Sequence, residues 1–97
     1  MNYRLHPQAA LEHEAQVAYY EDRATGLGVR YHVEFRKTVK QICQNPSRFK
    51  MLKKPDIRQG SIDGFPFFVV FRAFNGDIEI LAVAHYRKKP NYWSKRG

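Results

Sequence analysis

The N-terminal half of the chain has the spacing of two amphipathic helices. The first, from Gln8 to about Ala24, follows Pro7, which suits a first helical turn, and its apolar stripe is Leu11, Ala15, Ala18 and Tyr19. The second runs from about Val29 to Gln44, and its apolar stripe is Tyr31, Phe35, Val39 and Ile42. The short glycine-containing connection, Gly26-Leu27-Gly28, predicts a helical hairpin.

The C-terminal half has the pattern of a β-meander. Tyr3 to Leu5 forms a short first strand, residues 46–56 form a basic loop, and Ile57 to Ile62 forms a second strand. Two longer strands, 65–74 and 77–85, flank Asn75-Gly76, a pair that favours a two-residue hairpin turn. The sequence therefore predicts an α+β fold of order β-α-α-β-β-β. The helical hairpin packs on one face of a small, mostly antiparallel sheet.

The Asn75-Gly76 turn fixes the register of the last two strands. It places Phe74 opposite Asp77 and Arg72 opposite Glu79, a favourable cross-strand pair. One face is then wholly apolar and belongs under the helices: Phe67, Val69, Phe71, Ala73, Ile78, Ile80, Ala82 and Ala84. The other face carries Phe68, Val70, Phe74, Leu81 and Val83, together with Arg72, Glu79 and His85.

One helical pair covers only one side of a sheet, so the second apolar face needs a cover. Each exposed large apolar side chain forgoes about 1.5–3 kcal/mol of burial. Two covers are open at this point: the C-terminal tail with Tyr92 and Trp93, or a partner chain.

Composition and charge narrow the kind of partner. The chain has 97 residues, which predicts one domain over 1–97. Residues 1–34 carry five acids and three bases (net −2), and residues 35–97 carry four acids and fourteen bases (net +10), which sum to the net charge of +8. An excess of this size favours an anionic partner. A single cysteine, Cys43, and an N-terminus without an apolar segment predict a cytoplasmic protein that does not associate with a membrane.

Several kinds of catalytic site have no sequence signal. No histidine pair has metal-ligand spacing, no glycine-rich phosphate loop is present, and Cys43 fits a packing role. We expect no metal and no cofactor. Metal-free phosphodiester cleavage remains open, because it needs only proton donors, acceptors and cations. Its candidate residues are Arg58, Arg72, His85, Arg87 and Tyr92.

The C-terminal tail, about 86–97, is basic and aromatic. Tyr92 and Trp93 stand among five cations, and aromatic residues with arginine commonly anchor protein interfaces. The tail therefore provides a candidate target-binding set: Arg87, Lys88, Lys89, Tyr92 and Trp93. Alternatively, Trp93 closes the core.

The order of these motifs resembles the toxins of the RelE/ParE superfamily, from bacterial type II toxin–antitoxin pairs. The similarity covers nearly the whole chain and includes Tyr19-Tyr20-Glu21, Gly26-Leu27-Gly28, Asn45-Pro46-Ser47-Arg48-Phe49, Ile57-Arg58, Phe65-Pro66-Phe67, Val70-Phe71-Arg72 and the ending His85-x-Arg87-x-x-Pro90-x-Tyr92-Trp93. The glycine turn, the Asn45-Pro46 helix end and this last motif are closer to the ParE branch.

The resemblance implies a cytoplasmic toxin neutralised by a cognate antitoxin, which alone contacts operator DNA. The antitoxin would cover the second sheet face at Phe68, Val70, Phe74, Leu81 and Val83. ParE-like members inhibit DNA gyrase without catalysis, whereas RelE-like members cut mRNA on the ribosome. The expected function is gyrase inhibition. The alternatives are a ribosome-dependent endoribonuclease and a basic interaction domain without toxicity.

Overall fold

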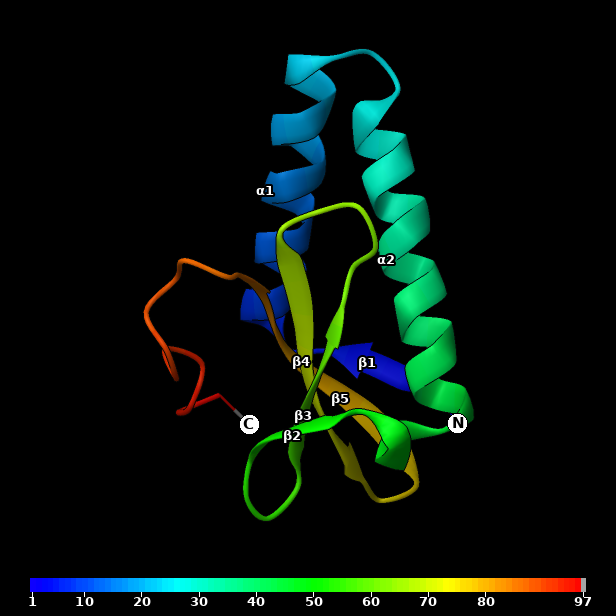
Figure 1. Cartoon of the computed structure of the whole chain (residues 1–97), viewed down its shortest axis with the longest axis vertical. Helices are drawn as coiled ribbons and strands as arrows, with labels where there is room; N and C mark the ends of the chain where they lie inside the picture. The colour runs from blue at the N-terminus through cyan, green and yellow to red at the C-terminus, as the bar shows by residue number, and fades with distance from the viewer. Residues whose placement is uncertain (97) are drawn as a thin grey trace.

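A computed structural model describes residues 1–96 and has two helices packed on a five-stranded sheet (Figure 1). The elements are β1 (Tyr3–Leu5), α1 (Pro7–Arg23), α2 (Leu27–Gln44), a 3₁₀ turn η1 (Pro46–Arg48), β2 (Lys50–Lys53), β3 (Ile57–Ser61), β4 (Phe67–Phe74) and β5 (Asp77–His85). The strand order is β1-β5-β4-β3-β2, with only the β1–β5 pair parallel. The predicted α+β fold with a helical hairpin on one sheet face is confirmed. Gly97, the last residue of the predicted tail, lies outside the described residues.

The region predicted as a basic loop contains an additional strand. Lys50 pairs with Gln59 and Met51 with Arg58, and the register then shifts so that Lys53 pairs with Ile57. β2 forms because β3 offers an unpaired edge, since four residues rich in lysine have little strand preference of their own. Lysines on such an outer edge also disfavour pairing with another chain. The meander therefore has four strands where three were predicted.

A carboxylate of α1 binds the backbone at the turn between the two helices. Glu21 accepts hydrogen bonds from the backbone N–H of Gly26 (2.8 Å) and of Gly28 (3.0 Å) at the start of α2. These contacts satisfy donors that a helix N-terminus otherwise leaves unpaired. A Cβ on Gly28 would lie 2.5 Å from the carbonyl oxygen of Val17, so the helices approach too closely there for a side chain.

The stripe predicted for α2 is confirmed, and the stripe predicted for α1 is wrong. The predicted α2 stripe, Tyr31, Phe35, Val39 and Ile42, is buried against the sheet. The predicted α1 stripe is exposed, including Leu11 (62%) and Tyr19 (51%). α1 instead turns Ala9 and His13 into the core, with Val17 and Tyr20 partly buried behind them. The sequence pattern did not reveal this face because histidine and tyrosine have polar atoms and do not read as plainly apolar positions.

A β-bulge changes which residues of β5 face the helices. The predicted pairs Phe74–Asp77 and Arg72–Glu79 are confirmed, but the register shifts between Val70 and Phe71. Val70 then lies opposite Ala82 and Phe68 opposite Ala84, where Leu81 and Val83 were predicted. An extra residue in one strand reverses the alternation beyond it.

The reversal moves four residues of β5 to the opposite side from that predicted. His85, predicted on the second face, lies opposite Phe67 on the helix side. Val83 belongs to the core under the helices, whereas Ala82 and Ala84 face the other side.

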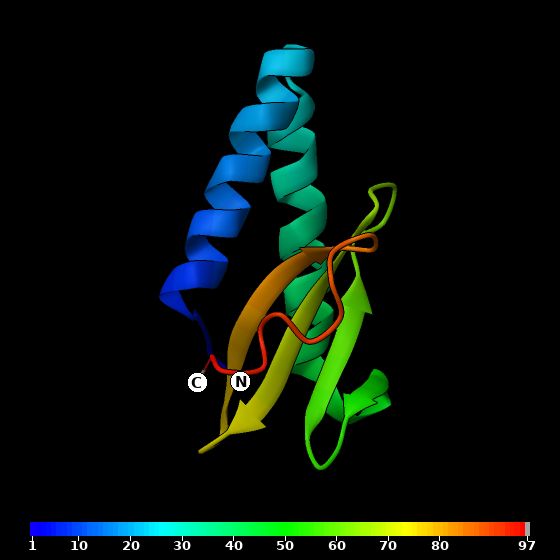
Figure 2. The same ribbon diagram turned by 90° about the vertical axis from the view of Figure 1, so that its left-hand side faces the viewer.

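The second sheet face is covered by the chain's own tail. Figure 2 shows the orange and red C-terminal segment crossing the strands. Trp93, only 2% exposed, packs with a second buried cluster of Val70, Leu81, Ala82 and Ala84. Of the two covers that the sequence left open, the structure shows the tail. Over the area that Trp93 occupies, the tail therefore stands where the resemblance implied an antitoxin.

Candidate functional site

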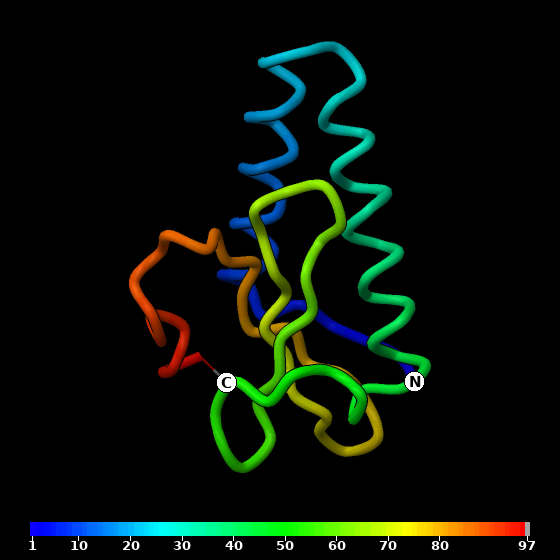
Figure 3. Tube along the Cα trace, viewed as in Figure 1, coloured from blue at the N-terminus to red at the C-terminus, as the bar shows by residue number. Residues whose placement is uncertain are grey.

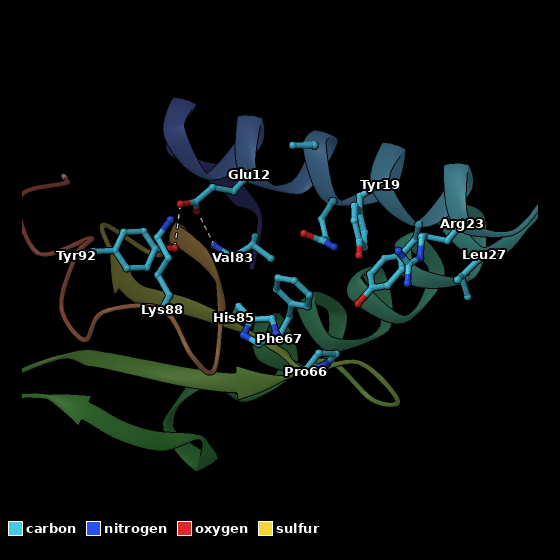
Figure 4. Close-up of a pocket in the computed structure, with 13 residues that line it drawn as sticks. Glu12, Tyr19, Arg23, Leu27, Pro66, Phe67, Val83, His85, Lys88 and Tyr92 are labelled. Atoms are coloured by element: carbon cyan, nitrogen blue, oxygen red, sulfur yellow. Dashed lines mark hydrogen bonds between the residues drawn. The ribbon is translucent and has the colours of Figure 1, made fainter.

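The tail is fastened to α1 by the carboxylate of Glu12. One carboxylate oxygen accepts the backbone N–H of Val83 (3.0 Å), and the other accepts the hydroxyl of Tyr92 (2.9 Å; Figure 4). Arg96 donates one guanidinium N–H to each oxygen, both at 3.0 Å, and a further one to the carbonyl of Leu81. The pairing of β1 with β5 ends at Leu5 and Ile80. Beyond that point, Glu12 and Arg96 bond the backbone groups of Val83 and Leu81 in β5.

A groove lies between α1 and the end of β5. Its volume is about 880 Å³, and α1 contributes Glu12, Ala15, Gln16, Tyr19, Tyr20 and Arg23 to its wall. The opposite wall includes Phe67, Val83, His85, Lys88 and Tyr92 (Figure 4). Because the exposed ring of Tyr19 and part of the α1 stripe lie here, the groove offers both apolar and cationic contacts to a partner.

The five residues of the predicted nuclease set do not converge. Arg58 lies opposite Phe71 on the helix side and donates to the carbonyl of Phe49 (2.7 Å). Arg72 lies on the other face and pairs with Glu79 (3.1 Å). His85 is opposite Phe67, five residues along β4 from Arg72, a separation of about 17 Å at strand rise.

The remaining two members of the set lie on the tail near His85. The backbone N–H of Arg87 donates to Nδ1 of His85 (3.0 Å), and Tyr92 lines the same groove as His85. Arg87 is exposed on the tail. The hydroxyl of Tyr92 donates to Glu12. Burial raises the pKa of Tyr92 above its ordinary value, and this hydrogen bond raises it further. A phenol with a raised pKa gives up its proton less readily and is a weaker general acid. His85 and Tyr92 share a groove, but neither Arg58 nor Arg72 lines it, so the set does not assemble around one point.

The predicted target-binding set is divided by the fold. Arg87, Lys88 and Lys89 are exposed, Tyr92 is partly buried with Lys88 and Arg96 over its ring, and Trp93 is buried. Three cations of the set are therefore free to meet a partner, whereas Trp93 holds the tail in place.

The predicted antitoxin-binding set is divided as well. Val70, Leu81 and Val83 are at most 4% exposed and lie in the two core clusters. Phe68 is partly buried beside Tyr86, and Phe74 is 44% exposed at the hairpin end. Of this set, Phe68 and Phe74 therefore remain the most accessible to a partner, and Val83 contributes to the wall of the groove.

The structure contains a histidine pair between the helices that the sequence pattern did not predict. The Nε2 atom of His13 and the Nδ1 atom of His32 are 2.8 Å apart, and the His13 ring stacks on Phe35 at 3.9 Å. Burial, with a smaller effect from His32, lowers the pKa of His13 to about 4. With its pKa lowered this far, His13 is neutral near pH 7. Helical spacing gave no hint that His13 faces inward.

Among residues 1–96, no three His, Cys, Asp or Glu side chains gather as they would around a metal ion. Neither α1 nor α2 has the length and apolarity of a membrane-spanning helix.

Comparison with known proteins identifies the fold. No protein-family model and no curated protein matches the chain. Among solved structures, the chain is similar to one described as "Chromosomal ParDE TA system from P. aeruginosa", with a TM-score of 0.73 and 20% sequence identity. The similarity covers 88% of this chain and 95% of the other. The fold is therefore shared over nearly the whole length of both chains.

Proposed function

We propose that this protein is the toxin of a type II toxin–antitoxin pair, that it acts in the cytoplasm, and that it inhibits DNA gyrase by binding. The observation that carries the proposal is the shared fold with a chain of a ParDE system over 88% of this sequence. The basic charge and the exposed cations of the tail support a binding role. The separation of Arg58, Arg72 and His85 favours inhibition by binding over RNA cleavage.

The cognate antitoxin would bind surfaces other than the buried part of the second sheet face. Phe74 and Phe68 remain from the predicted contact set, and the groove along α1 adds Tyr19 and Tyr20. A largely apolar groove beside an exposed apolar helix stripe fits a segment that folds on binding. In this proposal the tail stays in place and forms one wall of the groove through Lys88 and Tyr92.

Gyrase would be contacted by the exposed cations of the tail, Arg87, Lys88 and Lys89. The Glu12–Arg96 contacts and Trp93 fix the segment that carries them. A positioned cluster of like charge speeds association with an anionic surface and limits the wrong orientations.

Induced expression in bacteria tests the proposal. Growth should stop after induction, with mRNA left uncut on ribosomes. Reversal of the three tail cations (Arg87→Glu, Lys88→Glu, Lys89→Glu) should restore growth. The matched control reverses three lysines around β2 (Lys50→Glu, Lys53→Glu, Lys54→Glu), has the same net charge and should remain toxic. Codon-positioned mRNA cuts lost in Arg72→Ala or His85→Ala would establish the nuclease instead, and unimpaired growth would favour a non-toxic interaction domain.

A further inference from the structure

The strand β1 has a free outer edge. It is the last strand of the sheet and pairs on one side only, with β5. The bonds from Ile78 N–H to the Asn2 carbonyl (2.9 Å) and from His6 N–H to the Ile80 carbonyl (2.8 Å) show which backbone groups point inward. Because these directions alternate along a strand, the N–H and C=O groups of Tyr3 and Leu5 point outward, away from β5.

A hollow of about 690 Å³ lies beside this edge, between β1 and α2. Figure 3 shows the N-terminus next to the C-terminal part of α2. The hollow is lined by Met1, Asn2, Tyr3, Val33, Arg36, Lys37, Val39, Lys40 and Cys43. Three of these apolar side chains are well exposed, at 41% for Tyr3, 44% for Val33 and 58% for Met1. The outward backbone groups of β1 therefore stand beside an accessible and partly apolar wall.

The wall is positively charged. Arg36 and Lys40 are exposed, and within residues 1–96 neither has an ion-pair or hydrogen-bond partner. Lys37 is neutralised in part by Glu34, at 3.3 Å. Arg36 and Lys40 are four residues apart and so lie on the same side of α2. The edge thus combines unpaired main-chain donors and acceptors with two uncompensated cations.

We propose that this edge binds an extended acidic polypeptide segment, which adds to β1 as a sixth strand. Main-chain hydrogen bonds to Tyr3 and Leu5 hold the segment, and carboxylates on its helix-facing side chains meet Arg36 and Lys40. The free edge explains why the segment is extended, and the charge of the wall explains why it is acidic. The opposite edge, β2, has lysines and a register shift, which disfavour such pairing. This surface is separate from the tail, so the inference stands whether or not the protein inhibits gyrase.

The test measures fluorescence anisotropy with a labelled decapeptide of alternating Glu and Val. The peptide should bind the full chain, and the Gln–Val peptide should bind about tenfold more weakly because it lacks the carboxylates. Arg36→Glu with Lys40→Glu should weaken binding of the Glu–Val peptide at least as much. The control Lys53→Glu with Lys54→Glu has the same net charge and should bind as the wild type does. Equal losses in both variants would show general charge attraction and contradict the proposal.

The strand geometry has its own test. Tyr3→Pro removes an outward N–H and should abolish peptide binding, whereas Tyr3→Ala keeps that N–H and should retain most of it. Melting curves establish that both variants fold. In the wild type, bound peptide should slow hydrogen exchange at the Tyr3 and Leu5 amides. The inference would be overturned if the peptide did not bind or if exchange at these amides did not change. It would also be overturned if oligothymidine of equal charge bound equally well through Arg36 and Lys40.

Discussion

Arg96 and Glu12, 84 positions apart in the sequence, form a two-pronged ion pair in which both N–O distances are 3.0 Å. The side chains are only 15% and 22% exposed, so solvent weakens the pair less than it would at the surface. The same carboxylate accepts the Val83 N–H and the Tyr92 hydroxyl. A single side chain of α1 therefore fixes the position of the basic tail.

Substitution of this carboxylate should destabilise the protein. Glu12→Gln keeps the size of the side chain but removes the charge, leaving Arg96 half-buried without its partner. We expect a loss of about 2–4 kcal/mol in the free energy of unfolding, measured by urea denaturation. The control Glu14→Gln, on the exposed side of α1, should change it by less than about 0.5 kcal/mol. Equal losses in both variants would show that the four contacts contribute little.

Removal of the Trp93 ring should expose the second sheet face. Trp93→Ala deletes the side chain that covers Val70 and Leu81, and large-to-small changes of this kind cost about 3–5 kcal/mol. The apolar strip should then bind the dye ANS, giving a fluorescence rise absent from the wild type. If the variant had the melting temperature of the wild type and caused no rise in ANS fluorescence, the tail would not protect this face in solution.

The buried histidine pair should make stability depend on pH. The pKa of His13 is about 4 in the folded protein and 6.5 in the unfolded chain, so the unfolded state takes up the proton first. Stability should be constant above about pH 6.5 and fall by about 3 kcal/mol as the pH drops to about 4.

The variant His13→Phe isolates this effect from the titration of carboxyl groups. Its free energy of unfolding should decrease less than that of the wild type over the same pH range. Parallel curves for the two proteins would contradict the assignment to His13.

The close contact of the helices at Gly28 should not tolerate a methyl group. In Gly28→Ala the new Cβ would approach the Val17 carbonyl to 2.5 Å and crowd Glu21, which caps α2. We expect a loss of about 1–3 kcal/mol, seen as a lower melting temperature. The adjacent Val29→Ala, at a position that is 63% exposed, is the control and should melt within a few degrees of the wild type. If Gly28→Ala melted at the wild-type temperature, the helices would have to be able to separate locally.

The sequence predicted most helices and strands well because the signals that define them come from neighbouring residues. The Asn75-Gly76 turn, the Arg72–Glu79 pair and the apolar stripe of α2 all follow from residues close in sequence or directly across one hairpin. The α1 stripe failed because α1 buries His13, a residue that the pattern counts as polar.

Features formed between distant residues could not be predicted. The bulge beside Leu81 has no turn residue to mark it, and it moved Val83 out of the predicted antitoxin-binding face. Glu12 and Arg96 are ordinary surface types in the sequence, and only the folded chain brings them together. Arg72 and His85, predicted on one face, lie on opposite faces for the same reason, because the register of β4 and β5 decides which face each occupies.

The most direct test of the proposed function is a supercoiling assay with purified gyrase, relaxed plasmid and ATP. The wild-type protein at micromolar concentration should block supercoiling, and reversal of Arg87, Lys88 and Lys89 to Glu should remove the block. The protein with Lys50, Lys53 and Lys54 reversed should inhibit as the wild type does. Undiminished supercoiling in the presence of folded wild-type protein would contradict the proposal that this chain acts on gyrase.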